Sequence, residues 1–171
     1  MQFLLILMRL THILAGVAWA GGAFLLTGFV TPAAQKSGPA GGQVMQQMSG
    51  PGKMPSFMTA VALLTTLSGL YLFDVRSGHF NMDWITTPVG IALSIGALAG
   101  IAAFLHGLFA TGPLTKKVAA LGQEMAANQG PPSPEQLAQM GKLQEKLARN
   151  GRISALLLLI TVGGMSLTGY I

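Results

Sequence analysis

Cysteine is absent from this 171-residue chain, and charged residues are scarce. Without a thiol the chain can form no disulfide, no thiolate nucleophile, no iron–sulfur cluster and no cysteine-bound zinc site. Only 9% of the residues are charged, whereas a soluble domain carries about 25%. The five acidic residues all lie outside the long apolar runs, which argues against a proton pump with an intramembrane carboxylate. No Walker loop and no HExxH motif is present, so nothing in the sequence indicates an enzyme of those classes.

Apolar residues make up 51% of the chain. Four intervals, at about 3–31, 55–74, 87–111 and 152–171, are long enough to cross ~30 Å of hydrocarbon as helices. Backbone groups in lipid must pair within their own segment, so these intervals should be α-helical. The sequence therefore predicts an all-α integral membrane protein, with residues 1–171 forming a single four-helix transmembrane bundle.

The first interval also raises the question of a signal peptide, because "FLLILM" is apolar and "AWA" resembles a cleavage site. A signal peptide carries its positive charge before the apolar run. Here Arg9 follows the start of that run, and the run continues beyond "AWA". We expect an uncleaved first span.

Basic residues are distributed unevenly between the connections. Eight of the ten Lys and Arg residues fall in the connections between spans one and two and between spans three and four. The positive-inside rule therefore places both long connections in the cytoplasm and both termini outside. The net charge of +5 is interpreted as loop charge of this kind, and no nucleic-acid partner is predicted.

The connection between spans three and four has helical patterning over residues 113–150. Leu114, Val118, Leu121 and Met125 recur at helical spacing. "SPEQ" then has the form of a capping box that starts a second helix. We expect a cytoplasmic helical hairpin that extends spans three and four, with Gly112-Pro113 kinking or breaking its first arm. This hairpin either packs on itself or docks a partner subunit.

The connection between spans one and two, residues 31–57, is rich in Gly, Pro and Gln and is expected to be irregular. It contains Met45, Met48 and Met54, and Met58 follows it directly. Thioethers are soft ligands that suit Cu(I), although methionine is also common where a loop lies on a bilayer. A copper role for this cluster is one hypothesis.

Two polar groups stand at the start of the first span. Arg9 and His12 are three residues apart and share a helix face. An arginine can extend its guanidinium to the membrane surface, but His12 lies about one turn deeper. An ionisable side chain inside a membrane is a functional candidate, and the alternative is an imidazole that bonds a neighbouring helix.

His106 is the second buried candidate, near the opposite end of span three. Because spans one and three run in the same direction, His12 and His106 should differ in depth by roughly 15 Å or more. They are therefore poor candidates for the two faces of one haem. His79 and Met165 lie on the same side of the membrane as His12, and His–His and His–Met pairs both ligate haem or copper. Arg9 would then neutralise a haem propionate.

The first span carries a family resemblance. His12, Trp19, Gly21, Gly22 and Phe24 resemble the first-helix pattern of CopD-like copper-resistance and HemJ-like membrane proteins. The resemblance covers roughly the first 75 residues. It implies a bundle in a bacterial inner membrane, with His12 binding haem b as in HemJ-like proteins or copper handling as in CopD-like proteins. The HemJ-like family also has a lysine within its third helix, and this chain has none there. The resemblance therefore does not extend to protoporphyrinogen oxidase activity.

Three functions follow as hypotheses. The leading one is a small b-type haem-binding or redox-associated membrane protein, with His12 as axial ligand and with Arg9, His79, His106 and Met165 as further site residues. The second is a copper-handling membrane protein. The third is a cofactor-free accessory subunit of a larger membrane complex or a homodimer, for which Gly96 and Gly100 offer a close-packing G-x-x-x-G face.

Overall fold

The computed structural model describes residues 2–50, 53–128 and 130–170, and over these residues every regular element is a helix. Four helices are long and apolar enough to cross a membrane: Gln2–Lys36, Met54–Arg76, Pro88–Ala127 and Pro134–Leu167. The elements in chain order are α1 (Gln2–Leu25), the π-helical η1 (Leu26–Val30), α2 (Thr31–Lys36), α3 (Gly38–Met48), α4 (Met54–Arg76), α5 (Met82–Ile85), α6 (Pro88–His106), the π-helical η2 (Gly107–Thr111), α7 (Gly112–Ala127) and α8 (Pro134–Leu167).

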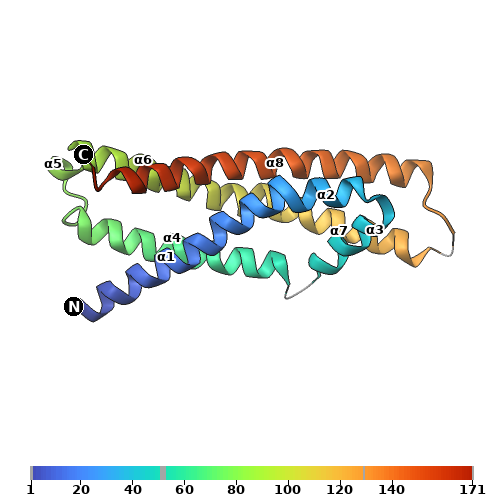
Figure 1. Cartoon of the computed structure of the whole chain (residues 1–171), viewed down its shortest axis with the longest axis horizontal. Helices are drawn as coiled ribbons and strands as arrows, with labels where there is room; N and C mark the ends of the chain where they lie inside the picture. The colour runs from blue at the N-terminus through green and yellow to red at the C-terminus, as the bar shows by residue number, and fades with distance from the viewer. Residues whose placement is uncertain (1, 51–52, 129, 171) are drawn as a thin grey trace.

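The long helices form two pairs. α1 packs along α4, and α6 packs along α8, while the contacts between the two pairs are far fewer. Figure 1 shows the pairs as two layers of an elongated bundle, with both termini and α5 at one end and the connecting segments α2, α3 and α7 toward the other. We name these the termini end and the connector end.

Small residues bring the helices of each pair together. Gly16 packs against Thr65, and a Cβ built on Gly16 would be 3.5 Å from the Thr65 methyl. In the other pair, a Cβ on Gly164 would lie 2.8 Å from the Ala92 carbonyl oxygen and 2.9 Å from the Gly96 Cα. In a membrane, helices gain little from apolar burial, so close van der Waals packing of this kind would hold such pairs together.

Over its described residues the first connection is mostly helical, so the expectation that it is irregular was wrong there, while residues 51–52 lie outside the described part. α2 and α3 each begin with a proline in the first turn, where the missing N–H costs nothing. Ser37 separates them, and Gly38, with φ of +57°, is the first residue of α3. Gly41 then allows α3 to cross α2, since a Cβ there would collide with the Ala34 carbonyl. These prolines and glycines start and stop short helices instead of preventing them.

Gly112-Pro113 does not end the helix. α6 continues through η2 into α7, and Pro113 lies in the first turn of α7. A proline ring clashes with the carbonyl four residues earlier, and the π-helical turn immediately before it absorbs that conflict. The next helix, α8, starts with the expected capping box, in which Ser133 and Gln136 bond each other's backbone N–H.

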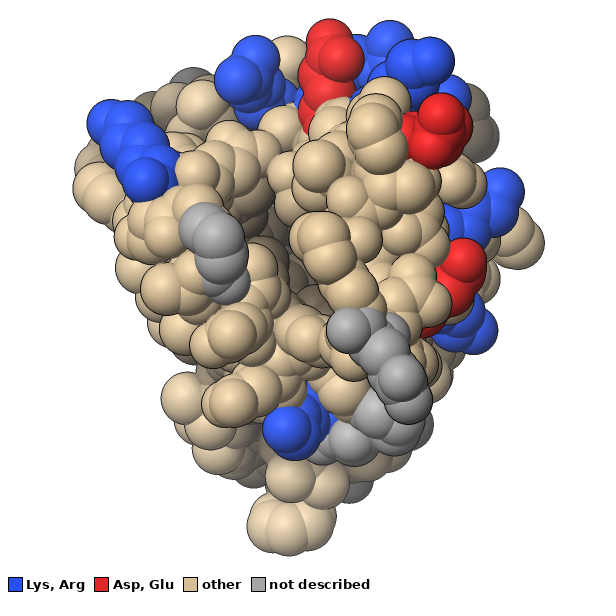
Figure 2. Space-filling view, turned by 90° about the vertical axis from the view of Figure 1, so that its right-hand side faces the viewer, with Lys and Arg blue, Asp and Glu red and all other residues tan. Residues whose placement is uncertain are grey.

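The surface of the four long helices is apolar. Phe3, Leu14, Phe29, Leu98 and Phe109 are each two-thirds or more exposed, which in water would be a large aggregation-prone patch. This surface suits contact with lipid chains. Charge gathers instead at the connector end, where Figure 2 shows basic side chains, with acidic ones among them, around the rim of a largely uncharged face.

Candidate functional site

A cavity of about 800 Å³ lies between the two helix pairs in the half of the bundle nearer the termini end. All four long helices contribute to its walls. Arg9, His12 and Trp19 come from α1, Arg76 comes from α4, and Met165 comes from α8. Its volume falls within the ~300–1,000 Å³ typical of ligand and cofactor pockets. We name it the His12 cavity.

The ring of His12 is held by α4. Its Nδ1 is 2.9 Å from the backbone carbonyl oxygen of Thr65. One turn further along α4, Gly69 leaves the space that the ring occupies, because a Cβ at Gly69 would stand 2.8 Å from His12 Cε1 and 3.0 Å from Nδ1. The imidazole therefore lies against bare backbone, and its position depends on a glycine and a main-chain acceptor.

This hydrogen bond determines which nitrogen carries the proton. A carbonyl oxygen only accepts, so Nδ1–H of His12 is the donor. In the neutral ring the lone pair is then on Nε2, and that is the nitrogen available to a metal. Metal-binding histidines are commonly oriented by a hydrogen bond of this kind to a backbone carbonyl. The contact with a neighbouring helix thus leaves His12 free to bind on its other nitrogen.

Two guanidinium groups line the same cavity. Arg9 precedes His12 by three residues, or about 4.5 Å along α1 toward the termini end. Arg76 is in the last turn of α4 at that end, and both arginines are exposed. Arginine forks bind carboxylates in two-pronged fashion. The cavity therefore combines an apolar interior with two cations at one end, which matches an amphipathic anion.

α6 and α8 form the facing wall. Gly100 and Thr161 lie together there, since a Cβ at Gly100 would be 3.2 Å from the Thr161 methyl. Met165 follows Thr161 by one helical turn and is half-buried. After the His12 imidazole, the Met165 thioether is the second potential metal ligand of the cavity.

His79 and His106 lie elsewhere. His79, with φ of 59°, is in the turn after α4, and its Nδ1 is 3.1 Å from an Asp74 carboxylate oxygen. The side chain is 84% exposed and does not line the His12 cavity. His106 is at the end of α6, with its Nδ1 3.1 Å from the Ser154 hydroxyl of α8. Of the residues singled out from the sequence, the structure brings Arg9, His12 and Met165 to one cavity.

Across the part of the chain that the structure describes, no group of three or more His, Cys, Asp or Glu side chains could hold a metal ion. One imidazole and one thioether suit a metal that brings most of its own ligands. Haem iron, with four nitrogens from its macrocycle, is such a metal, so the donor set of the His12 cavity fits a haem.

Sequence reasoning missed three features of this region: Gly69, Arg76 and the division into two halves. An internal repeat could have revealed the last. The pattern Phe24-Leu25-x-x-x-Phe29-x-Thr31 recurs 80 residues later as Phe104-Leu105-x-x-x-Phe109-x-Thr111, with a proline following each. These two stretches include η1 and η2. Binding sites between helical repeats are a common arrangement in membrane proteins.

No family profile, curated protein or solved structure matches the chain. The resemblance of its first helix to CopD-like and HemJ-like proteins therefore stays a prediction.

Proposed function

We propose that the chain is a multi-pass protein of a bacterial inner membrane that binds a b-type haem in the His12 cavity and serves in electron transfer. In this proposal both termini lie outside, and α2, α3 and the α7–α8 hairpin lie in the cytoplasm. The basic rim of the connector end supports that orientation. The first-helix resemblance to HemJ-like proteins points to haem b, while the missing lysine argues against protoporphyrinogen oxidation.

The observation that carries the proposal is the setting of His12. A half-buried imidazole donates from Nδ1 to Thr65 and faces a cavity of about 800 Å³ in a protein region that otherwise exposes apolar side chains. A histidine kept only for helix packing would not need so large a space beside it. The hydrogen bond fixes the ring and directs its remaining lone pair to a ligand.

The other residues have distinct parts in this site. His12 Nε2 on α1 and the Met165 thioether on α8 would hold the haem iron. Arg9 and Arg76 would pair with the two propionates near the membrane surface. Trp19 and the aliphatic side chains of α4 and α6 exclude water. A bound haem supplies one-electron redox chemistry, with a potential that depends on its axial ligands and burial.

Absorption spectroscopy of the purified protein tests this proposal. The wild type, made in haem-replete cells and extracted in mild detergent, is expected to show a Soret band. His12→Ala should lose most of that band. His79→Ala is the matched control, because its ring is exposed and outside the cavity, and it should retain the wild-type spectrum. Equal spectra for His12→Ala and wild type would refute the role of His12.

The remaining hypotheses are distinguished in the same preparation. Bound copper without a Soret band would favour the copper-handling function. Its ligands would be His12, Met165 and the methionines at the first connection, Met45, Met48, Met54 and Met58. Neither cofactor, together with co-purifying subunits or a stable homodimer, would favour the accessory subunit.

A further inference from the structure

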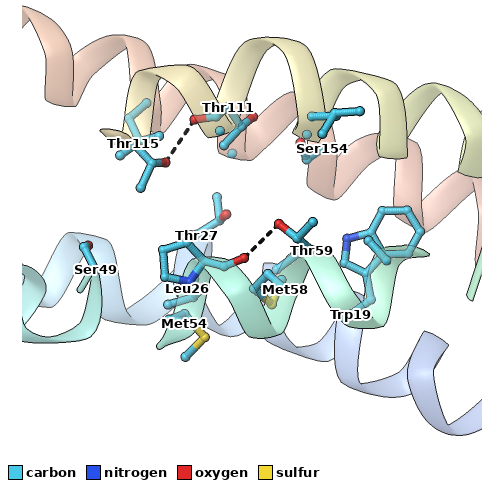
Figure 3. Close-up of a pocket in the computed structure, with 18 of the residues that line it drawn as sticks. Trp19, Leu26, Thr27, Ser49, Met54, Met58, Thr59, Thr111, Thr115 and Ser154 are labelled. Atoms are coloured by element: carbon cyan, nitrogen blue, oxygen red, sulfur yellow. Dashed lines mark hydrogen bonds between the residues drawn. The ribbon is translucent and has the colours of Figure 1, made fainter. Parts of the chain in front are cut away.

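A second cavity, of about 250 Å³, lies between the helix pairs in the half of the bundle nearer the connector end. Trp19 lines both cavities and stands between them. Figure 3 shows Thr27 and Thr59 rising from one helix pair toward Thr111, Thr115 and Ser154 of the other. We name this the Thr111 cavity. None of the described residues that line it carries a charge.

Both π-helical segments face this cavity. η1 contributes Leu26 and Thr27, and η2 contributes Gly107, Leu108 and Thr111. Pro32 and Pro113 each follow these segments after one intervening residue. π-helical turns are rare and occur frequently at functional sites. Two of them, formed by the repeated sequence pattern and turned to one cavity, indicate that the cavity is a built feature of the fold.

The hydroxyl groups around the cavity differ in their bonding. The Thr59 and Thr115 hydroxyls donate to the Pro55 and Thr111 carbonyl oxygens of their own helices. Thr111 Oγ1 is buried, and it has no hydrogen-bond partner among the described residues. Burying an unsatisfied hydroxyl is unfavourable. Thr111 itself lines the cavity, so a rotation of its side chain would present this hydroxyl to a ligand oxygen that satisfies it.

Ser154 adds a second hydroxyl to the lining of this cavity. Its Oγ is 3.1 Å from Nδ1 of His106, which lies just before η2. When Nδ1–H donates to Ser154, the serine proton is free to donate into the cavity. This gives His106, which the His12 cavity does not use, a part in positioning a donor.

We propose that the Thr111 cavity binds the ring of a membrane quinone. The walls are mainly apolar, so they suit a flat ring, and the hydroxyls of Thr111 and Ser154 suit its carbonyl oxygens. A cavity of about 150 Å³ takes a benzene ring, so 250 Å³ has room for ring substituents. The proposal stands on this cavity alone and does not require a haem in the other one.

A soft metal ion on the methionines is the competing occupant. Met45, Met48, Met54 and Met58 all line the cavity. However, the Met58 sulfur packs against Gly22, because it lies 2.9 Å from where a Cβ of Gly22 would stand. Thioethers alone also leave the Thr111 hydroxyl unexplained. These observations favour the quinone.

Quenching of Trp19 fluorescence tests the proposal. The chain has two tryptophans, so the Trp84→Phe background leaves Trp19 as the only indole. The probe is a short-tailed methoxybenzoquinone, titrated into the full-length protein in detergent. Saturable quenching is expected, and Thr111→Val should raise Kd roughly tenfold by removing one hydrogen bond. Thr115→Val is the control, because that hydroxyl already bonds its own helix, and its Kd should stay within about twofold.

The same variant gives a second, opposite readout. Thr111→Val removes an unsatisfied buried hydroxyl, so without quinone it should melt at a temperature equal to or above that of the Trp84→Phe background. Quenching that does not saturate, or equal Kd values for Thr111→Val and Thr115→Val, would overturn the proposal. Silver(I), used as a stand-in for Cu(I), tests the competing occupant. The quinone proposal would also be overturned if silver(I) raises the melting temperature, Met45→Leu abolishes that rise, and quinone does not bind.

Discussion

Gly69→Ala tests how α4 holds the imidazole of His12. The new methyl would stand 2.8 Å from His12 Cε1 and 3.0 Å from Nδ1, whereas ordinary contact begins at 3.4 Å. The ring must therefore move by about 0.6 Å or more. That movement lengthens the 2.9 Å hydrogen bond to Thr65 and shifts Nε2 with the rest of the ring.

Two effects oppose each other in the stability of this variant. Replacing glycine by alanine within a helix stabilises it by roughly 0.5–1 kcal/mol. Weakening one hydrogen bond costs about 1 kcal/mol, and forcing a methyl against the ring adds roughly 1–3 kcal/mol of overpacking. The net effect is a destabilisation of about 1–3 kcal/mol. Loss of a residue that orients a ligand typically lowers metal affinity by roughly 10–100-fold.

Haem titration of the apoprotein, followed by the Soret band, measures the affinity change, and thermal unfolding in detergent measures stability. Gly21→Ala is the matched control, because a Cβ at Gly21 meets nothing within 4 Å and the residue is exposed on α1. It should bind haem as the wild type does. If Gly69→Ala binds haem as tightly as Gly21→Ala, the imidazole is not held in the way described here.

Four further outcomes are expected. Gly164→Ala should lower the melting temperature by the equivalent of about 1–3 kcal/mol, because its Cβ would meet the Ala92 carbonyl and the Gly96 backbone within 3.0 Å, whereas Gly163→Ala, with nothing within 4 Å, should not. Ser133→Ala should cost about 1 kcal/mol and speed amide exchange in the first turn of α8. The pKa of Glu135 is lowered below 4.5 by hydrogen bonds from the backbone N–H of Glu135 and from Ser133. The contribution of the Glu135 carboxylate to folding stability is therefore present above that pH and is lost as the pH falls through the lowered pKa. A protease site inserted near Gly130 should be cut only after cells are opened, and cleavage in intact cells would reverse the orientation.

Long continuous apolar runs in the sequence predicted the four apolar helices well. The runs of Leu, Ile and Ala required helices in lipid, and the Ser133–Gln136 capping box marked the start of α8 from four adjacent residues. The prediction for the first connection was wrong, because its glycines and prolines were interpreted by composition alone. Pro32 falls in the first turn of α2, where proline favours a helix, so its position mattered more than its frequency.

The candidate site was predictable only in part. Arg9 and His12 stand out because lipid penalises such groups. The acceptor for His12 is a backbone carbonyl, and the space for its ring is the missing side chain of Gly69. Neither has a signature in the residue letters. The two cavities depend on how loosely the helix pairs oppose each other, which is a property of the packing between segments far apart in the chain.

The ratio of haem to protein in the purified wild type is the most direct test of the central claim. It is measured as the pyridine haemochrome of protein made in haem-replete cells, beside a b-type cytochrome produced in the same way. The account predicts about one b-type haem per chain, released by acid because it is not covalently bound. A loaded reference cytochrome beside a chain that carries no haem would contradict it.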